Sequence, residues 1–301
     1  MQEIEFKFQV PVKKRKALQK AFTLLKAEPI HLAAQYFDTA DQTLAKHCIA
    51  IRRRQENDEW KQTFKAVNSA KALSRFELEF DIEPPETTTL DLDNYKKDYS
   101  AIYKKLKRAL GLPLPTLELL FETNIQRLRV LQDVGSSTVE IALDIGKIFE
   151  EQNSVDIFEI EFELKQGSIE DLIAFIRPWV QKYQLSLDTH SKSDYGLLAV
   201  RQQSYFSAQY QTPLVLNRSS SEVEALQSIV ANCLQHLLPN ASSIARQQYS
   251  SEHIHQARVA IRRLRSALKS FAAWSDAIQP HWKAELTTIF QALGGTRDID
   301  A

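Results

Sequence analysis

Two patterns of hydrophobic and polar residues divide the chain. Up to about residue 200, the two kinds of residue repeatedly alternate with a period of two, which is typical of β-strands. Helical stretches intervene at Val12–Leu25, Ile102–Leu110 and Ile169–Tyr183. From about Ser219 onward the pattern is helical only, and Ser221 has the position of a helix N-cap ahead of two glutamates. The sequence therefore predicts an α+β part followed by an all-α part.

The boundary between the two parts follows from local composition. A chain of 301 residues is long enough for two domains that each bury a core. Residues 201–218 contain several Ser and Gln residues and Pro213, and they read as a connection. We therefore predict a first domain over residues 1–200, a linker over 201–218 and a helical domain over 219–301.

The strands of the first part have a polar face that is almost entirely ionic. In the first strand the charged residues Glu3, Glu5 and Lys7 share one face, and the apolar residues between them share the other. The same arrangement recurs in six further segments: 52–54, 60–65, 75–82, 127–130, 139–145 and 158–165. Some of these strands carry only bases on that face, whereas others carry three carboxylates in a row.

A solvated face of an antiparallel sheet would explain any single strand of this kind. Seven such strands together favour another interpretation, because neighbouring carboxylates repel one another and need cations for compensation. If the sheet closes with its ionic faces inward and its apolar faces outward under the helices, its interior is a channel lined by acids and bases. The pattern thus predicts an inverted barrel.

Such an interior suits a linear polyanion that is carried together with divalent cations. Guanidinium and ammonium groups bind phosphate oxygens, and clustered carboxylates offer the oxygen ligands that Mg²⁺ and Mn²⁺ prefer. Phosphoryl transfer needs positioning, charge neutralisation and an activated water rather than covalent chemistry from the protein. The ionic strands therefore point to phosphoryl chemistry.

Bulk composition narrows the choice of partners. Lys plus Arg equals Asp plus Glu at 38 each, so net charge gives no argument for nucleic acid or membrane binding, and we expect neither. Residues 201–301 hold 10 basic and 7 acidic residues, which makes the second part slightly basic. Only seven glycines occur and none forms a phosphate-cradling loop, which argues against a P-loop or dinucleotide-binding fold.

Cysteine usage and the first residues indicate the compartment. Cys48 and Cys233 fit no metal or redox spacing, so we expect free thiols in a reducing environment. The seven histidines are scattered, which argues against zinc. The segment Met1–Glu5 lacks the features of a secretory signal, and no run approaches the roughly 18 apolar residues of a membrane span. We expect a cytoplasmic protein.

The ionic strands resemble the CYTH superfamily, also called triphosphate tunnel metalloenzymes. Its signature Glu-x-Glu-x-Lys stands at Glu3, Glu5 and Lys7. The match continues in the expected order through Tyr36-Phe37-Asp38-Thr39, Arg52 with Arg54, Lys65, Arg75 to Glu79, Arg127 with Arg129, Glu140 with Asp144, Glu159 to Lys165 and Ser191-Lys192-Ser193. This resemblance covers about residues 1–200 and implies an antiparallel eight-stranded β-barrel with surrounding helices. In one departure, Tyr195 precedes Gly196 where the family often has Arg.

The resemblance also implies roles for individual residues. The expected ligands of Mg²⁺, with Mn²⁺ as an alternative, are Glu3, Glu5, Asp144, Glu159, Glu161 and Glu163. The expected triphosphate-binding residues are Lys7, Arg52, Arg54, Lys65, Arg75, Arg127, Arg129, Lys165 and Lys192. Catalysis is expected from Glu5, Lys7, Glu161 and Lys192. Arg75, Glu77 and Glu79 suit ligand binding or internal ion pairs equally well, and an ion pair with a neighbouring Arg is favoured for Glu140.

The segment Ser250–Trp274 predicts a helix with a continuous basic stripe. Steps of three and four residues separate the members of this stripe: His255, Arg258, Arg262, Arg265 and Lys269. Glu252 is the single acid within residues 252–272, which favours anion binding over a neutralised solvated face. The run from Val259 to Arg265, with the preceding His255 and the later Arg297-Asp298-Ile299-Asp300, resembles a CHAD domain. Residues 219–301 match only the first half of its helical repeat pair, and the resemblance implies polyphosphate binding.

These observations lead to a metal-dependent triphosphatase that hydrolyses inorganic tripolyphosphate to pyrophosphate and phosphate. A nucleotide- or thiamine triphosphate-using member of the superfamily, such as a triphosphatase or a class IV adenylyl cyclase, would share the channel but need a pocket for the organic group. A non-catalytic polyphosphate-binding protein would keep the basic residues and could lose the acidic ones. The retained carboxylates favour the enzyme.

Overall fold

The computed structural model describes residues 2–67, 74–90, 92, 95–96, 99–150 and 153–294, with the backbone alone described at residues 2, 3, 67, 74 and 75. The chain divides into two compact units, of which the first holds residues 1–69 and 73–203 and the second holds residues 204–301. The first unit is α+β and the second is helical, which confirms the fold class predicted for the two parts of the chain.

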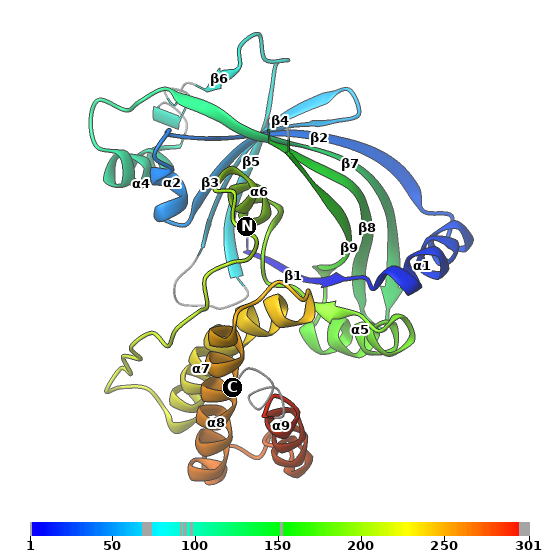
Figure 1. Cartoon of the computed structure of the whole chain (residues 1–301), viewed down its shortest axis with the longest axis vertical. Helices are drawn as coiled ribbons and strands as arrows, with labels where there is room; N and C mark the ends of the chain where they lie inside the picture. The colour runs from blue at the N-terminus through cyan, green and yellow to red at the C-terminus, as the bar shows by residue number, and fades with distance from the viewer. Residues whose placement is uncertain are drawn as a thin grey trace. The chain divides into compact units, whose positions relative to one another are not determined.

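The first unit is built on one antiparallel sheet (Figure 1). Its strands are β1 Gln2–Gln9, β2 Glu28–Asp38, β3 Ile49–Glu56, β4 Glu59–Val67, β5 Ser74–Ile82, β6 Thr89–Leu90, β7 Leu117–Val134, β8 Ser137–Glu150, β9 Asn153–Gln166 and β10 Ser186–Leu187. The main strand order is β10-β1-β5-β4-β3-β2-β7-β8-β9, and β6 pairs with β7. β1 pairs with β5 over Gln2–Ile4 and with β9 over Glu5–Gln9, so it contacts two strands that are far apart in this order.

Helices follow the periodic segments closely. The first unit contains α1 Val12–Leu24, α2 Thr43–Lys46, α4 Ser100–Leu110, α5 Ile169–Tyr183 and α6 Lys192–Val200, and the second contains α7 Glu222–Ala245, α8 Ser251–Ser270, α9 Pro280–Ala292 and the 3₁₀ turn Ala272–Trp274. Ser221 caps α7, as predicted, because its hydroxyl accepts from the Glu224 amide and Glu224 reciprocates. The helix predicted over Ser250–Trp274 is too long, since α8 ends at Ser270 and the chain then tightens into the 3₁₀ turn.

The apolar faces of the strands lie under helices. Phe8, Ile141 and Phe162 from β1, β8 and β9 form one core cluster with Phe22 of α1 and Leu172 of α5. A second cluster joins residues of β3 and β4 with α2 and α4. This confirms the predicted orientation of the apolar positions, and the opposite face of the sheet carries the charged side chains. We call that opposite face the ionic face.

Two local features place helices at the ends of strands. The buried carboxylate of Asp38, at the end of β2, accepts hydrogen bonds from the backbone amides of Leu44 (2.8 Å) and Ala45 (2.9 Å) and so satisfies the first turn of α2. The second feature is Ser191, which caps α6 through a capping box with Asp194. This cap fixes the start of α6 and therefore the position of Lys192, its first residue.

The second unit has a polar interior between α7 and α8. His236 Nε2 lies 2.8 Å from Gln256 Oε1, and Arg263 donates to Asn232 Oδ1 at 2.7 Å. Cys233 is buried here, and it is a free thiol like the exposed Cys48 of the first unit. No helix in the described part of the chain is both long and apolar enough to cross a membrane.

Candidate functional site

Strand register brings the ionic residues of β7, β8, β9 and β1 side by side. Arg127 pairs with Asp144, and Asp144 pairs with Glu159 on its other side. Lys7 pairs with Glu161 across the β1–β9 ladder. Because directly paired residues in an antiparallel sheet point to the same face, these five side chains converge on the ionic face.

Lys192 lies at the centre of an acidic cluster formed by Asp144, Glu159 and Glu161. Its ammonium is 2.6 Å from Asp144 Oδ2, 2.5 Å from Glu159 Oε1 and 2.8 Å from Glu161 Oε1. Burial alone would lower the pKa of Lys192, but these three carboxylates raise it well above its ordinary value. Lys192 therefore stays charged.

Arg127 binds the same carboxylates from the side of β7. Its Nε and Nη2 atoms each lie 2.7 Å from an oxygen of Asp144, which is the bidentate geometry of a strong ion pair, and Nη2 also contacts Glu161. Burial raises the pKa of Glu161, but Lys192 and Arg127 hold it well below the ordinary value. For Asp144, the same two cations more than offset burial and lower the pKa. Both carboxyl groups are thus ionised.

The acidic cluster fits a hard divalent cation. Asp144, Glu159 and Glu161 each offer an oxygen, and these oxygens all lie within 4.8 Å of one another. Glu5 adds a fourth carboxyl group nearby, and burial together with the charge of Glu161 raises its pKa to about 7. A carboxyl group with so high a pKa lies where positive charge is insufficient, although Lys65, Lys192 and Arg127 partly compensate it. A bound cation would supply the missing charge.

Lys7 closes the cluster on the side of β1. Its ammonium donates to the backbone carbonyl of His190 and lies 3.3 Å from Glu159 Oε2 and 3.9 Å from Asp188 Oδ2. Burial would lower the pKa of Lys7, but Glu159 and Asp188 raise it. The Glu159 carboxylate therefore bridges two ammonium groups, with Lys7 at Oε2 and Lys192 at Oε1.

A second charged cluster comes from β3, β4 and β5. Arg52 lies 3.7 Å from Glu77 Oε1 and 3.9 Å from Glu79 Oε2, and it donates to Thr63 Oγ1 at 3.3 Å. Arg54 Nη2 lies 3.1 Å from Glu79 Oε2. The long Arg52 ion pairs leave donor capacity on the guanidinium, as a residue that binds a phosphate requires. This cluster contains Glu77 and Glu79 as internal partners of the bases.

The two clusters influence each other electrostatically. Lys65 of the second cluster forms a 2.7 Å ion pair with Glu77 and also lowers the pKa of Glu5 in the first. Tyr36 of β2 responds to both: burial raises its pKa, but Arg52, Lys192 and Lys65 lower it overall. The predicted residues of distant strands thus share one electrostatic environment.

Further residues of the ionic face lie toward the β7–β8 hairpin. Arg129 Nη2 pairs with Glu28 Oε2 at 2.9 Å, and Lys165 lies 2.9 Å from Glu163 and 3.7 Å from Glu140. Arg129, Lys165, Glu28 and Glu140 line an open cavity of about 410 Å³. Glu163, which the resemblance assigns to metal, is thus a partner of Lys165, whereas the ion pair expected for Glu140 is made with Lys165 rather than Arg.

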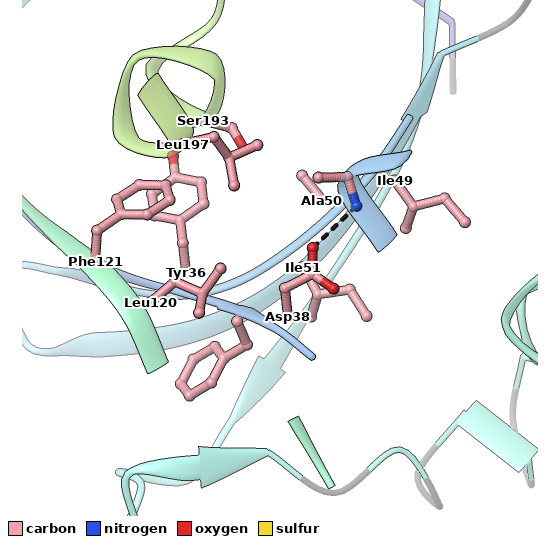
Figure 2. A pocket seen from close by; sticks show the side chains of 11 residues that line it. Tyr36, Asp38, Ile49, Ala50, Ile51, Leu120, Phe121, Ser193 and Leu197 are labelled. Atoms are coloured by element: carbon pink, nitrogen blue, oxygen red, sulfur yellow. Dashed lines mark hydrogen bonds between the residues drawn. The ribbon is translucent and has the colours of Figure 1, made fainter. Parts of the chain in front are cut away.

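The opposite end of the ionic face is apolar and covered by α6. Tyr36 and Phe121 stack at 4.5 Å between ring centres, and Figure 2 shows Ser193 and Leu197 of α6 facing this ring pair. A side chain on Gly196 would lie 2.1 Å from the Phe121 ring, so only glycine permits this close approach. The remaining cavity is about 10 Å³, room for about one water.

Two predicted site residues lie outside the described side chains. Glu3 and Arg75 are directly paired between β1 and β5, and only their backbones are described. The segment Arg297-Asp298-Ile299-Asp300, which contributes to the resemblance of the second unit, is also outside the described residues.

The strand pattern missed four polar residues beside Lys7. Asp188 and His190 follow β10, Tyr195 lies in α6, and Gln9 ends β1. Asp188 accepts hydrogen bonds from Tyr195 Oη at 2.8 Å and Gln9 Nε2 at 2.9 Å. Gln9 continues the alternation of Glu3, Glu5 and Lys7 and could have been found from it. Asp188 and His190 lie in a loop without periodicity, so no sequence signal marks them.

The basic stripe of α8 is only partly open to solvent. His255, Arg262 and Lys269 are exposed. Arg258 and Arg265 are half-buried, and their guanidiniums lie 4.5 Å and 5.7 Å from the centre of the Phe290 ring of α9. Because α9 packs on this part of α8, the five residues do not form one uniform exposed surface.

An antiparallel sheet that gathers buried carboxylates and cations on one face defines a site for an anion together with a metal ion. The family comparison is consistent with that class. A model described as the CYTH domain matches residues 1–194, and one described as the CHAD domain matches residues 228–301. The chain belongs to the CYTH family, with a CHAD match following the CYTH domain, as the sequence motifs predicted.

Individual relatives are more distant. A protein named inorganic triphosphatase from Haemophilus influenzae is 31% identical over 204 residues, which are 66% of this chain and 55% of that protein. The chain thus spans about half the length of this curated relative. Among solved structures, a putative adenylate cyclase from Bacillus halodurans has a TM-score of 0.44 and 20% identity, covering 64% of this chain and 96% of that one. A putative adenylyl cyclase from Hippeastrum, reported to have a dominant triphosphatase activity, has a TM-score of 0.46 and 18% identity, covering 67% and 96%.

Proposed function

We propose that the first unit is a Mg²⁺-dependent triphosphatase that hydrolyses inorganic tripolyphosphate to pyrophosphate and phosphate. The observation that carries this proposal is the convergence of three carboxylates, Asp144, Glu159 and Glu161, with the cations Arg127 and Lys192. The Haemophilus influenzae relative is named inorganic triphosphatase, which supports an inorganic triphosphate as the substrate. Mn²⁺ is an alternative metal, because it accepts the same oxygen ligands.

The residues that would hold Mg²⁺ are Asp144, Glu159 and Glu161, with Glu5 next to them. When bound there, the ion would neutralise phosphate charge and increase the acidity of a coordinated water. Glu5 would accept the proton of the attacking water at a carboxylate oxygen, because its carboxyl group interacts with Glu161 beside these ligands.

The bases of the ionic face would bind and align the phosphate chain. Arg52 and Arg54 offer guanidinium forks from β3, and Lys65, Arg127 and Lys192 add charges from three other elements. Their present ion pairs with carboxylates would be exchanged for pairs with phosphate oxygens. The same guanidinium and ammonium groups would stabilise the negative charge that develops on the reacting phosphate.

A closed barrel would confine this substrate, and the strand pairing supports closure. The ladders run β1-β5-β4-β3-β2-β7-β8-β9, and β9 pairs again with β1. The cavity beside Tyr36 and Phe121, of about 10 Å³, has no room for a nucleoside or thiamine, whereas the open cavity of about 410 Å³ beside Arg129 and Lys165 is large enough for one. The choice of an inorganic triphosphate therefore rests on the name of the Haemophilus influenzae relative.

One assay series tests the proposal. Phosphate release is measured from tripolyphosphate, ATP, thiamine triphosphate and long-chain polyphosphate, each with Mg²⁺, Mn²⁺ or EDTA. We expect metal-dependent turnover with tripolyphosphate as the best substrate, and its loss in Glu161→Gln and Glu5→Gln. Glu118→Gln, at an exposed position of β7, is the matched control. Unchanged phosphate release by Glu161→Gln would reject the proposal.

We further propose that α8 of the second unit binds polyphosphate. Its exposed residues His255, Arg262 and Lys269 support this, and Glu252, the single acid within residues 252–272, is hydrogen-bonded to Gln256 at 2.7 Å. Arg262→Gln with Lys269→Gln should weaken binding of long-chain polyphosphate, measured by filter retention at low and high salt. Lys283→Gln, an exposed lysine of α9, is the control, and equal binding by all three proteins would contradict this role.

A further inference from the structure

The ammonium of Lys7 is enclosed by polar groups from outside the acidic cluster. It donates to the backbone carbonyl of His190, and Asp188 Oδ2 lies 3.9 Å away. The ammonium also lies 5.6 Å from the centre of the Tyr195 ring, within cation–π range. Only 8% of Lys7 is exposed, so these groups and Glu159 define its surroundings.

Asp188 is itself held rigidly. It is 3% exposed, and its Oδ2 atom accepts hydrogen bonds from Tyr195 Oη at 2.8 Å and Gln9 Nε2 at 2.9 Å. Its Oδ1 atom accepts from the backbone amide of His190 at 2.9 Å. Burial raises the pKa of Asp188, but Lys7 and the hydrogen bonds more than offset that effect and lower the pKa. Three donors thus fix an ionised carboxylate beside Lys7.

The backbone ties this carboxylate to Lys7 and to Lys192. The Asp188 amide donates to the Lys7 carbonyl at 2.8 Å, directly after β10 pairs with β1 through Leu187 and Phe8. Four residues later the chain starts α6 at Lys192. The short segment from Leu187 to Lys192 therefore positions two ammonium groups, that of Lys7 at Glu159 Oε2 and that of Lys192 at Glu159 Oε1.

We propose that Asp188 and Tyr195 are positioning residues that hold the Lys7 ammonium ready to contact a phosphate oxygen. This inference rests on the proposed function of the ionic face as a triphosphate site. A lysine side chain has many rotamers, so fixing it in one of them costs conformational entropy. If the side chain is already ordered before the substrate arrives, substrate binding does not have to supply this free energy. Without Asp188, the ammonium would move onto Glu159 in a closer ion pair, and a phosphate would have to break that pair.

Tyr195 gives this arrangement a feature of its own. Its hydroxyl donates to Asp188 Oδ2, and its ring face lies toward the Lys7 ammonium. Because this donor is neutral, it fixes the Asp188 carboxylate without neutralising it, and the negative charge of Asp188 remains to attract Lys7.

Steady-state kinetics on tripolyphosphate with the full chain give the first test. We expect Tyr195→Phe to raise KM about tenfold and Asp188→Asn about thirtyfold, with kcat within about threefold, as loss of one charge-assisted hydrogen bond or of the counter-ion implies. In a Lys7→Gln background, Asp188→Asn should add little, because the group it positions is already absent. Tyr183→Phe, at another buried tyrosine, is the matched control.

A spectroscopic readout separates this inference from the enzymatic proposal. In protein labelled with ¹⁵N-lysine, a buried ammonium that exchanges slowly with water gives an Nζ–H signal, which Lys7→Gln assigns to Lys7. We expect this signal to shift or broaden in Tyr195→Phe and Asp188→Asn and to persist in Tyr183→Phe. Far-UV circular dichroism identifies any variant that fails to fold, and the nearly isosteric Tyr195→Phe then carries the test.

The possible results have distinct meanings. A wild-type protein that hydrolyses tripolyphosphate, with unchanged KM in Tyr195→Phe and Asp188→Asn, would overturn the positioning role and leave the proposed function intact. A wild-type protein that hydrolyses no triphosphate would reject the proposed function. In that case an unchanged Lys7 signal in both variants would also reject the positioning role, and a shifted signal would support it.

Discussion

Glu5→Gln removes a carboxyl group whose titration should govern the stability of the first unit. Burial and the charge of Glu161 raise the pKa of Glu5 from 4.5 to about 7. Between these two pH values the unfolded chain releases the Glu5 proton while the folded chain retains it. The folded state then binds more protons, so the free energy of unfolding falls as pH rises from about 4.5 to about 7.

The size of this effect follows from the two pKa values. Their difference corresponds to about 3 kcal/mol at pH values above both, since each tenfold change in an equilibrium is about 1.4 kcal/mol. Glutamine cannot ionise and therefore escapes this loss. We expect the free energy of unfolding of Glu5→Gln minus that of wild type to increase by about 3 kcal/mol between pH 4.5 and pH 8, which means that the variant gains stability relative to wild type.

Hydrogen exchange of the β8 and β9 amides, followed by mass spectrometry with EDTA present, measures this difference in the first unit itself. Wild type and variant are compared at equal pH, so that the intrinsic pH dependence of exchange cancels. Glu118→Gln, at an exposed carboxylate, should show no such trend. A difference between Glu5→Gln and wild type that stays constant within about 1 kcal/mol across this range would refute the reasoning.

The remaining predictions concern metal, packing and capping. Added Mg²⁺ should stabilise the wild type most near and above pH 7, where it compensates the ionised Glu5, and Glu5→Gln should lose this pH dependence in thermal melts. Gly196→Ala should cost about 1–3 kcal/mol in denaturant unfolding, because its methyl group would collide with the Phe121 ring; equal stability would contradict that contact. Arg127→Met should cost about 3–5 kcal/mol by the same measurement, because it leaves Asp144 buried without its bidentate partner, and a loss below about 1 kcal/mol would argue against this pair. Asp38→Ala should cost about 1–2 kcal/mol by uncapping α2, and unchanged amide protection at Leu44 would refute it.

The periodic segments were predicted well because their signal is local. α5 begins and ends at the predicted residues, and α1 differs by one residue at its end. The alternation in the strands also indicated which face would lie under helices, since a strand with charges at every second position can bury only its other face. α8 ends earlier than predicted, because the chain leaves the helical conformation at Phe271. The spacing of the basic residues in α8 does not indicate where the helix ends.

The candidate site was predictable as a list of residues but not as a set of partners. The family resemblance had placed Asp144, Glu159 and Glu161 among the expected metal ligands, and these three carboxylates lie together in the structure. It could not indicate that Lys192 contacts all three or that Glu163 pairs with Lys165, because these contacts depend on where α6 and the strand register place each side chain. Asp188 escaped detection for the same reason.

By itself, the sequence determined the elements, the apolar and ionic faces of the strands and the family. These follow from periodicities of two and 3.6 residues and from ordered motifs, which depend only on neighbours along the chain. Only the tertiary structure decided that Lys7 and Lys192 both contact the carboxylate of Glu159, although they come from opposite ends of the first unit. Burial then set the pKa of Glu5, because the cost of a charge depends on the solvent and ions that surround it in space.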